Sequence, residues 1–136
     1  MTRPGLSAWL GERCAADWAA DLDTAQRAAL HALVRTAFID TAACMLAGRD
    51  EPVVARVAQW TGLAGAAHEL ALPLRAGEGP HALVPELCAL VNATAGHALD
   101  FDDVGLAGHP SVVLVPALLA MHDGAGTRGF ALVQAY

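Results

Sequence analysis

The sequence contains no lysine, and its eight arginines are scattered singly along 136 residues. With 14 aspartates and glutamates, the formal net charge is -6. A protein that binds the phosphate backbone of a nucleic acid needs positive side chains gathered on one face. We therefore expect no nucleic-acid partner.

Charged residues of either sign are scarce. They make up 16% of the chain, and 55% of the residues are hydrophobic, whereas about 25% charged residues is usual for a soluble domain. So few charges cannot cover the whole surface of a folded chain, and an exposed apolar face commonly binds a partner. The composition therefore predicts association with another chain, most simply as a homo-oligomer.

Cysteine is also rare, and the three present, Cys14, Cys44 and Cys88, are far apart in the sequence. They form no Cys-x-x-Cys pair, and their odd number leaves one thiol unpaired in any set of disulfides. This spacing favours reduced, buried thiols over disulfides or a zinc site.

Long apolar runs suited to a membrane are missing as well. Pro4 and Gly5 stand where the apolar core of a secretory signal would begin. Residues 104–122 contain no Asp, Glu, Lys or Arg, but two prolines and two glycines interrupt them. A spanning helix needs about 20 predominantly apolar residues in a row. We expect a cytoplasmic protein with no membrane partner.

Helical periodicity is the main pattern that is present. Apolar residues recur at every third or fourth position from Leu30 to Met45, which places them on one stripe of an α-helix. Asp23 or Thr24 can cap the start of this helix. Gly48 can end it, because glycine readily adopts a left-handed conformation.

Three prolines mark further helix starts. Proline is preorganised for the first turn of a helix, and Pro52, Pro85 and Pro110 each stand at the beginning of an apolar segment. Shorter helices are expected over residues 6–18 and, capped by Thr127, over residues 128–136.

Extended structure is expected at most as a short edge strand over residues 68–75, because the proline in that segment removes a ladder hydrogen bond. The length is that of one ordinary domain. The sequence thus predicts an all-α, bundle-like fold of five to six helices in a single domain, residues 1–136.

A dense polar cluster occupies residues 92–111, which read NATAGHALDFDDVGLAGHPS. It holds two histidines and three aspartates between two apolar segments. These are His97, Asp100, Asp102, Asp103 and His109. Imidazole and carboxylate groups exchange protons in acid–base catalysis, so this stretch is the candidate active site.

Other interpretations fit the same residues. Aspartate, asparagine and glycine are ordinary turn residues. In a second interpretation the stretch is therefore purely structural: it caps helix ends and forms a solvated loop. In a third interpretation, His97, Asp100, Asp103 and His109 bind a metal ion, since all four are acceptable ligand types. The residues alone leave the three interpretations open.

The run Asn-x-Thr-x-x-His-Ala-Leu-Asp-Phe-Asp-Asp from Asn92 to Asp103, followed by His-Pro-Ser from His109 to Ser111, resembles the signature of the MmgE/PrpD family. That family includes 2-methylcitrate dehydratases, cis-aconitate decarboxylase and an iminodisuccinate epimerase. Residues 38–48 and 115–120 are similar to helices of the family, and the likeness extends from about Leu22 to the end of the chain. The resemblance implies part of the family's helical domain, from its N-terminal portion, without the lid domain.

The resemblance assigns catalysis to Asp100 and His109. The side chains that it assigns to substrate binding are His97, Asp103, Val104 and Ser111. Family reactions remove or deliver a proton at carbon next to a carboxylate, by dehydration, decarboxylation or epimerisation of di- or tricarboxylates. The resemblance therefore implies a carbon–oxygen lyase similar to 2-methylcitrate dehydratase, with a small polycarboxylate substrate, no cofactor and no metal. Val104 departs from the threonine that is usual in the family.

The resemblance also implies that the site is incomplete within this chain. A polycarboxylate needs positive groups that hold it and disperse the charge of a carbanion, but no arginine lies between Arg75 and Arg128. Members of the family supply lysine, histidine and tyrosine from later helices and the lid. We therefore expect an inactive isolated chain that associates with a second copy or with a complementing C-terminal chain. The alternative function is a non-catalytic helical scaffold or interaction module from a truncated gene.

Overall fold

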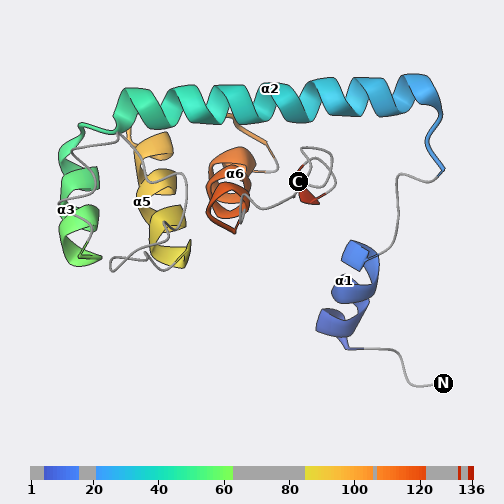
Figure 1. The fold of residues 1–136 in the computed structure, drawn as a ribbon, viewed down its shortest axis with the longest axis horizontal. Coiled ribbons are helices and arrows are strands. Elements are labelled where there is room, and N and C mark those ends of the chain that lie inside the picture. Colours follow the sequence, from blue (N-terminus) through green and yellow to red (C-terminus); the bar gives the residue numbers. More distant parts are fainter. Residues whose placement is uncertain (1–4, 16–20, 63–84, 106, 122–131, 133–134) are drawn as a thin grey trace.

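The computed structural model describes residues 5–15, 21–62, 85–105, 107–121, 132 and 135–136. Within these ranges it contains five helices (Figure 1). They are α1 (Leu6–Ala15), α2 (Thr24–Gly48), α3 (Pro52–Trp60), α5 (Pro85–His97) and α6 (Pro110–Met121). No β-strand occurs in these ranges, where a single bridge joins Gly105 to Gly108 across a turn. The predicted all-α fold is confirmed.

Helix α2 is the longest element, and three shorter helices pack on one side of it. In Figure 1, α3, α5 and α6 lie side by side across α2, and α1 lies apart from them. Contacts join α5 to α2, α3 and α6, and α6 also contacts α2. Helix α5 is therefore the central element of the packed layer.

The start of α2 is fixed by a capping box. The Asp23 carboxylate accepts a hydrogen bond from the backbone N–H of Gln26 at 2.8 Å, and the Gln26 side chain accepts one from the N–H of Asp23 at 2.9 Å. These two bonds satisfy donors that have no partner inside the helix. Of the two predicted caps, Asp23 is the one that forms.

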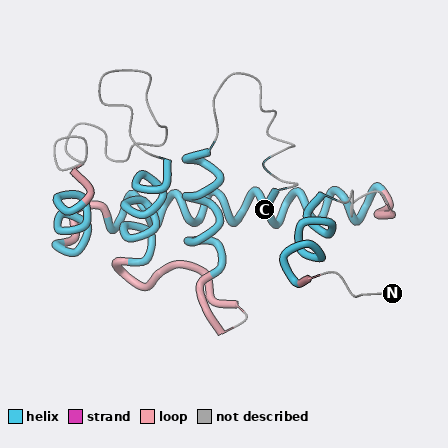
Figure 2. Tube along the Cα trace, turned by 90° about the horizontal axis from the view of Figure 1, so that it is seen from below, coloured by secondary structure: helices cyan, strands magenta, loops and turns pink. Residues whose placement is uncertain are grey.

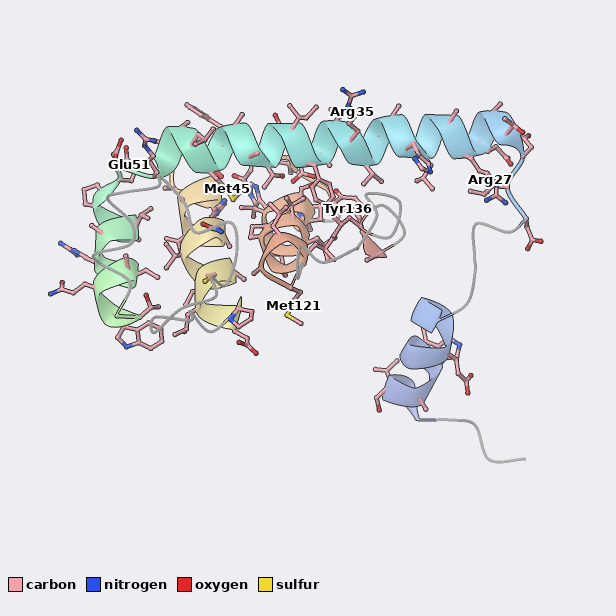
Figure 3. All side chains as sticks on the ribbon, viewed as in Figure 1. Arg27, Arg35, Met45, Glu51, Met121 and Tyr136 are labelled. Carbon is pink, nitrogen blue, oxygen red and sulfur yellow. The ribbon has the colours of Figure 1, made fainter. Side chains whose placement is uncertain are left out.

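The hydrophobic core lies between α2, α3 and α5. Its centre is Met45, which is fully buried, and in Figure 3 Met45 lies on the side of α2 that faces α5, whereas Arg35 points outward. The other buried members of this cluster are Val54, Ala58, Val91 and Ala95. Residues from three helices thus share one core, as the apolar stripe on α2 predicts.

Two glycines allow the helices to approach this closely. A Cβ atom on Gly48 would collide with the backbone oxygen of Ala95, and one on Gly96 would lie 2.6 Å from Val112 Cγ2. Helix α2 does end at Gly48, but the expected left-handed conformation is wrong: among the described glycines, only Gly62 has a positive φ. Gly48 is needed because α5 packs against it.

The three prolines begin helices as predicted, at the first residues of α3, α5 and α6. Helix α6 continues through Pro116, which is buried. The strand expected over residues 68–75 lies outside the described residues, as do residues 16–18 and most of the helix expected over 128–136.

Of the described helices, α2 alone has the length and composition of a membrane-spanning helix, with 25 residues. The core helix of a soluble protein meets the same criterion. Met45, Thr41 and Val34 of α2 are buried within the protein.

Candidate active site

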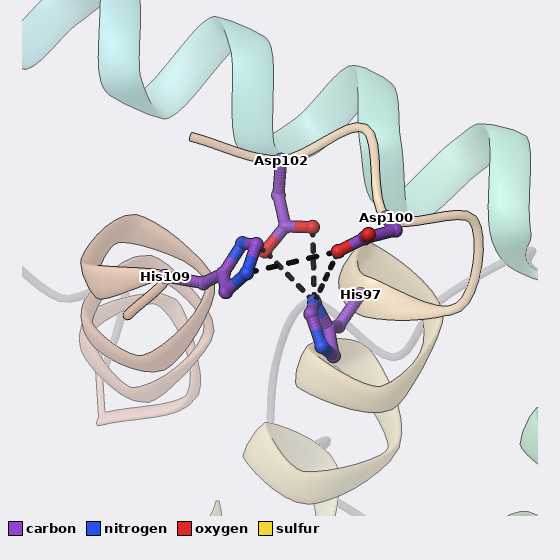
Figure 4. A group of neighbouring side chains, drawn as sticks. All are labelled: His97, Asp100, Asp102 and His109. Carbon is purple, nitrogen blue, oxygen red and sulfur yellow. Dashed lines mark hydrogen bonds and ion pairs between the residues drawn. The ribbon is translucent and has the colours of Figure 1, made fainter. Parts of the chain in front are cut away.

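The candidate site lies where α5 ends and α6 begins. Residues 98–109 connect the two helices (Figure 2). Because α5 and α6 pack side by side, their facing ends bring the two histidines together from opposite ends of this loop. Figure 4 shows the four side chains that converge there, which are His97, Asp100, Asp102 and His109.

The carboxylate of Asp102 is the centre of this group. Its side chain is 0% exposed. Nδ1 of His97 donates to the two oxygens of Asp102, at 3.0 and 3.2 Å. Nδ1 of His109 lies 3.1 Å from Asp102 Oδ2, as an ion pair without a hydrogen bond. A buried carboxylate thus holds both imidazoles.

Asp100 lies at the outer edge of the group, with its side chain 77% exposed. Its Oδ1 atom is 3.6 Å from His109 Nε2 and 4.0 Å from His97 Nδ1. Its backbone is left-handed, with φ of 56°, which is unfavourable for most residues but more accessible to aspartate. Strained backbone of this kind gathers at functional sites, and here it turns the Asp100 carboxylate toward the histidines.

The hydrogen bonds restrict the protonation of His97. Since the Asp102 carboxylate accepts from Nδ1 of His97, that nitrogen carries a proton, and Nε2 is the position left for exchange with a substrate. The ring centroids of His97 and His109 are 4.5 Å apart in an edge-to-face arrangement.

A pocket of about 520 Å³ adjoins the two histidines. Apolar side chains from α3, α5 and α6 form most of its wall. Its lining residues are Val53, Ala93, Thr94, His97, Ala98, His109, Val112 and Val113. A small molecule in this pocket would contact both imidazoles and otherwise mainly hydrocarbon.

The comparison with protein-family models matches residues 13–136 to the MmgE/PrpD N-terminal domain. The chain belongs to the MmgE/PrpD family. This confirms the resemblance seen in the signature and places it in the N-terminal part of the family. No curated protein and no solved structure gives a significant match.

Asp103 and Ser111, also assigned to the site by the family signature, bond to each other. The carboxylate of Asp103 accepts from the Ser111 backbone N–H at 3.1 Å and from Ser111 Oγ at 2.6 Å. Ser111 Oγ is also 2.6 Å from the hydroxyl of Tyr136. Asp103 therefore caps the first turn of α6, where a negative charge is favourable, and Tyr136 joins the chain end to this cap.

The structure brings together three of the six residues that the signature assigns, namely Asp100, His109 and His97. Val104 is 79% exposed. The sequence analysis placed Asp102 in the polar cluster but gave it neither a catalytic nor a binding role, although its side chain occupies the centre. One signal was available: residues two apart in an extended segment point the same way, so Asp102 could share the side of Asp100.

Two cysteines lie near the core but are poorly suited to catalysis. Burial raises the pKa of the Cys44 thiol, and the carboxylates of Asp40, Asp102 and Asp103 raise it further. Burial also raises the pKa of Cys88. Both are free and buried, as predicted, and a neutral thiol is a weak nucleophile. The side chain of Cys14 lies outside the described residues.

Asp102 and Asp100 provide a matched pair for testing this geometry. Asp102→Asn replaces a buried acceptor of His97 with an amide, so we expect the free energy of unfolding to fall by about 1–3 kcal/mol. Asp100→Asn should change it by less than about 0.5 kcal/mol, because its side chain is exposed and asparagine tolerates a left-handed backbone. Urea denaturation with an unchanged m-value measures both. Equal losses in the two variants would contradict the central role of Asp102.

Proposed function

We propose that this chain provides the acid–base residues of an MmgE/PrpD-type lyase that acts on a di- or tricarboxylate. The reaction moves a proton at carbon next to a carboxylate, in a dehydration, decarboxylation or epimerisation. Dehydration of the kind carried out by 2-methylcitrate dehydratase is the favoured member of this class. The proposal needs no cofactor, and a cytoplasmic location stays part of it.

The observation that supports the proposal best is the convergence of Asp100 and His109. These residues are nine positions apart, yet Asp100 Oδ1 lies 3.6 Å from His109 Nε2. A carboxylate and an imidazole at this distance can act as a complementary base and acid on one substrate. Both groups are also accessible, since Asp100 is largely exposed and His109 lines the pocket.

Asp102 acts as a positioning residue in this proposal. Its carboxylate binds Nδ1 of His97 and lies against Nδ1 of His109. A buried carboxylate on the far side of an imidazole orients the ring and stabilises its protonated form, as in catalytic triads. Asp102 therefore supports proton transfer at the outer nitrogens without touching the substrate.

The described side chains supply only some of the positive groups that an anionic substrate needs. Within the described part of the chain, the ion pairs of Asp100 and Asp102 are all with histidines, and the sequence has no lysine. Protonated imidazoles are thus the positive groups that this segment brings to the site, and further cations have to come from other segments or another chain. We infer that the isolated 136-residue chain lacks dehydratase activity.

Replacing Asp100 and His109 tests the proposed function. In a full-length family enzyme that carries this N-terminal domain, Asp100→Asn and His109→Ala should each lower kcat by roughly 10²- to 10⁴-fold, the usual effect of losing a positioned acid or base. His31→Gln on α2 and Asp50→Asn in the turn after α2 are matched controls outside the site, and both should leave kcat unchanged. Turnover at the normal rate with both Asp100 and His109 replaced would show that the stretch is only a helix connection.

The alternative, a helical interaction module, is supported by apolar side chains on the outside of α2. Ile39 and Leu46 are 60% and 53% exposed, and residues seven apart share one face of a helix. Tyr136 and Asp103 also border a second apolar pocket of about 520 Å³ along α2. We propose that a second copy or a complementing C-terminal chain covers these surfaces, whether or not the assembly is catalytic.

Sedimentation velocity of the purified chain tests this association. We expect a dimer or larger species, and Ile39→Glu together with Leu46→Glu should shift it toward monomer, because charge on an apolar interface opposes burial. A monodisperse wild-type monomer that binds no hydrophobic dye would exclude self-association through an exposed apolar face.

A further inference from the structure

We propose that His97, Asp100, Asp102 and His109 also form a binding site for one divalent transition-metal ion of the zinc type. Each residue offers one ligand atom, and the four atoms lie within 4.8 Å of one another. Asp102 replaces Asp103 in the set expected from the sequence, because both oxygens of Asp103 bond to Ser111. This inference concerns binding and does not depend on the proposed proton transfer.

The separations between the ligand atoms fit a small ion. Zinc–nitrogen and zinc–oxygen bonds of about 2.1 Å place tetrahedral ligands about 3.4 Å apart. His97 Nδ1 is 3.0 Å from Asp102 Oδ1, and His109 Nε2 is 3.6 Å from Asp100 Oδ1. The longest of these ion pairs, between His97 Nδ1 and Asp100 Oδ1, is 4.0 Å. Asp100 is largely exposed, so its carboxylate can turn toward an ion without disturbing the core.

The other ligands are held in place before any ion binds. His97 is the last residue of α5, and His109 directly precedes α6. Asp102 is fixed by burial, and its Oδ2 lies 3.1 Å from Nδ1 of His109. Because Nδ1 of His109 faces Asp102, Nε2, which lies 3.6 Å from Asp100 Oδ1, is the nitrogen directed at the ion.

Charge favours occupation by a divalent cation. The carboxylates of Asp100 and Asp102 lie together, and among the described residues their ion pairs are with the two histidines alone. A ligand nitrogen must be unprotonated, so the ring proton of His97, which Nδ1 donates to Asp102 in the metal-free chain, moves to Nε2 when the ion binds. With both imidazoles neutral, a divalent ion balances the two negative charges. Two nitrogen and two oxygen ligands suit zinc and its neighbours, whereas magnesium and calcium prefer oxygen alone.

Metal binding and proton transfer exclude each other at this site. A ligated imidazole nitrogen has its one lone pair occupied, and a bound cation lowers the basicity of a carboxylate, so neither group can act as a base toward a substrate. A bound ion would therefore inhibit the proposed reaction. Metal binding is measured on the chain without substrate, and activity is measured with a chelator present. A negative result in one measurement therefore leaves the other proposal untouched.

Isothermal titration of the chelator-treated chain with ZnCl₂ at neutral pH tests the site. We expect saturation at one ion per chain. His97→Gln and Asp100→Asn should each weaken the affinity at least about ten-fold, with unchanged far-UV circular dichroism. His31→Gln removes an imidazole on α2 outside the cluster and should bind as the wild type does. With Co²⁺, the wild-type chain should show the visible absorption of a four-coordinate site.

Three results would overturn the metal site. They are the absence of saturable zinc binding, affinity that stays unchanged in both His97→Gln and Asp100→Asn, and loss of binding in His31→Gln. If His97→Gln fails to fold, the affinity of Asp100→Asn tests the site instead. That variant is expected to fold because the Asp100 side chain is 77% exposed. The wild-type Co²⁺ spectrum decides independently of any variant: a purely octahedral spectrum would count against the site.

Discussion

The buried carboxylate of Asp102 is the group on which the arrangement of the site depends. Removing a carboxylate from water costs several kcal/mol unless it is paired, and here the compensating groups are the imidazoles of His97 and His109. These histidines lie at the end of α5 and just before α6. Satisfying one buried charge therefore sets the separation between two helix ends, and the same contacts direct the outer edges of both rings toward the pocket.

Helix packing makes this convergence possible. Gly48 lets α5 approach α2, and Gly96 leaves room for Val112 of α6. Larger side chains at either glycine would push the helix ends apart, and the histidines would separate with them. The neighbouring residue, Asp103, holds the start of α6 through Ser111. Adjacent aspartates thus perform different tasks: one orients the histidines, and the other caps the helix that follows them.

Local rules predicted much of the fold. Proline is constrained at its own position, so the starts of α3, α5 and α6 could be read from the sequence. Contacts between residues that are far apart in the chain could not be predicted from the sequence. The sequence suggested that Gly48 ends its helix in a left-handed conformation. The tertiary structure shows instead that its small size lets α2 pack closely against α5 at Ala95. The family signature drew attention to Asp100 and His109, whereas Asp102 looked like a loop aspartate because burial is not visible in a run of acidic residues.

The central claim is that Asp102 orients the two histidines, and its most direct test is long-range ¹H–¹⁵N NMR of the histidine rings at a pH where they are neutral. The account predicts that His97 carries its proton on Nδ1, because that nitrogen donates to Asp102, and that Asp102→Asn abolishes this preference. His31, which lies on α2, serves as the internal reference. Finding His97 protonated on Nε2 in the wild type, with a spectrum unchanged by Asp102→Asn, would contradict the account.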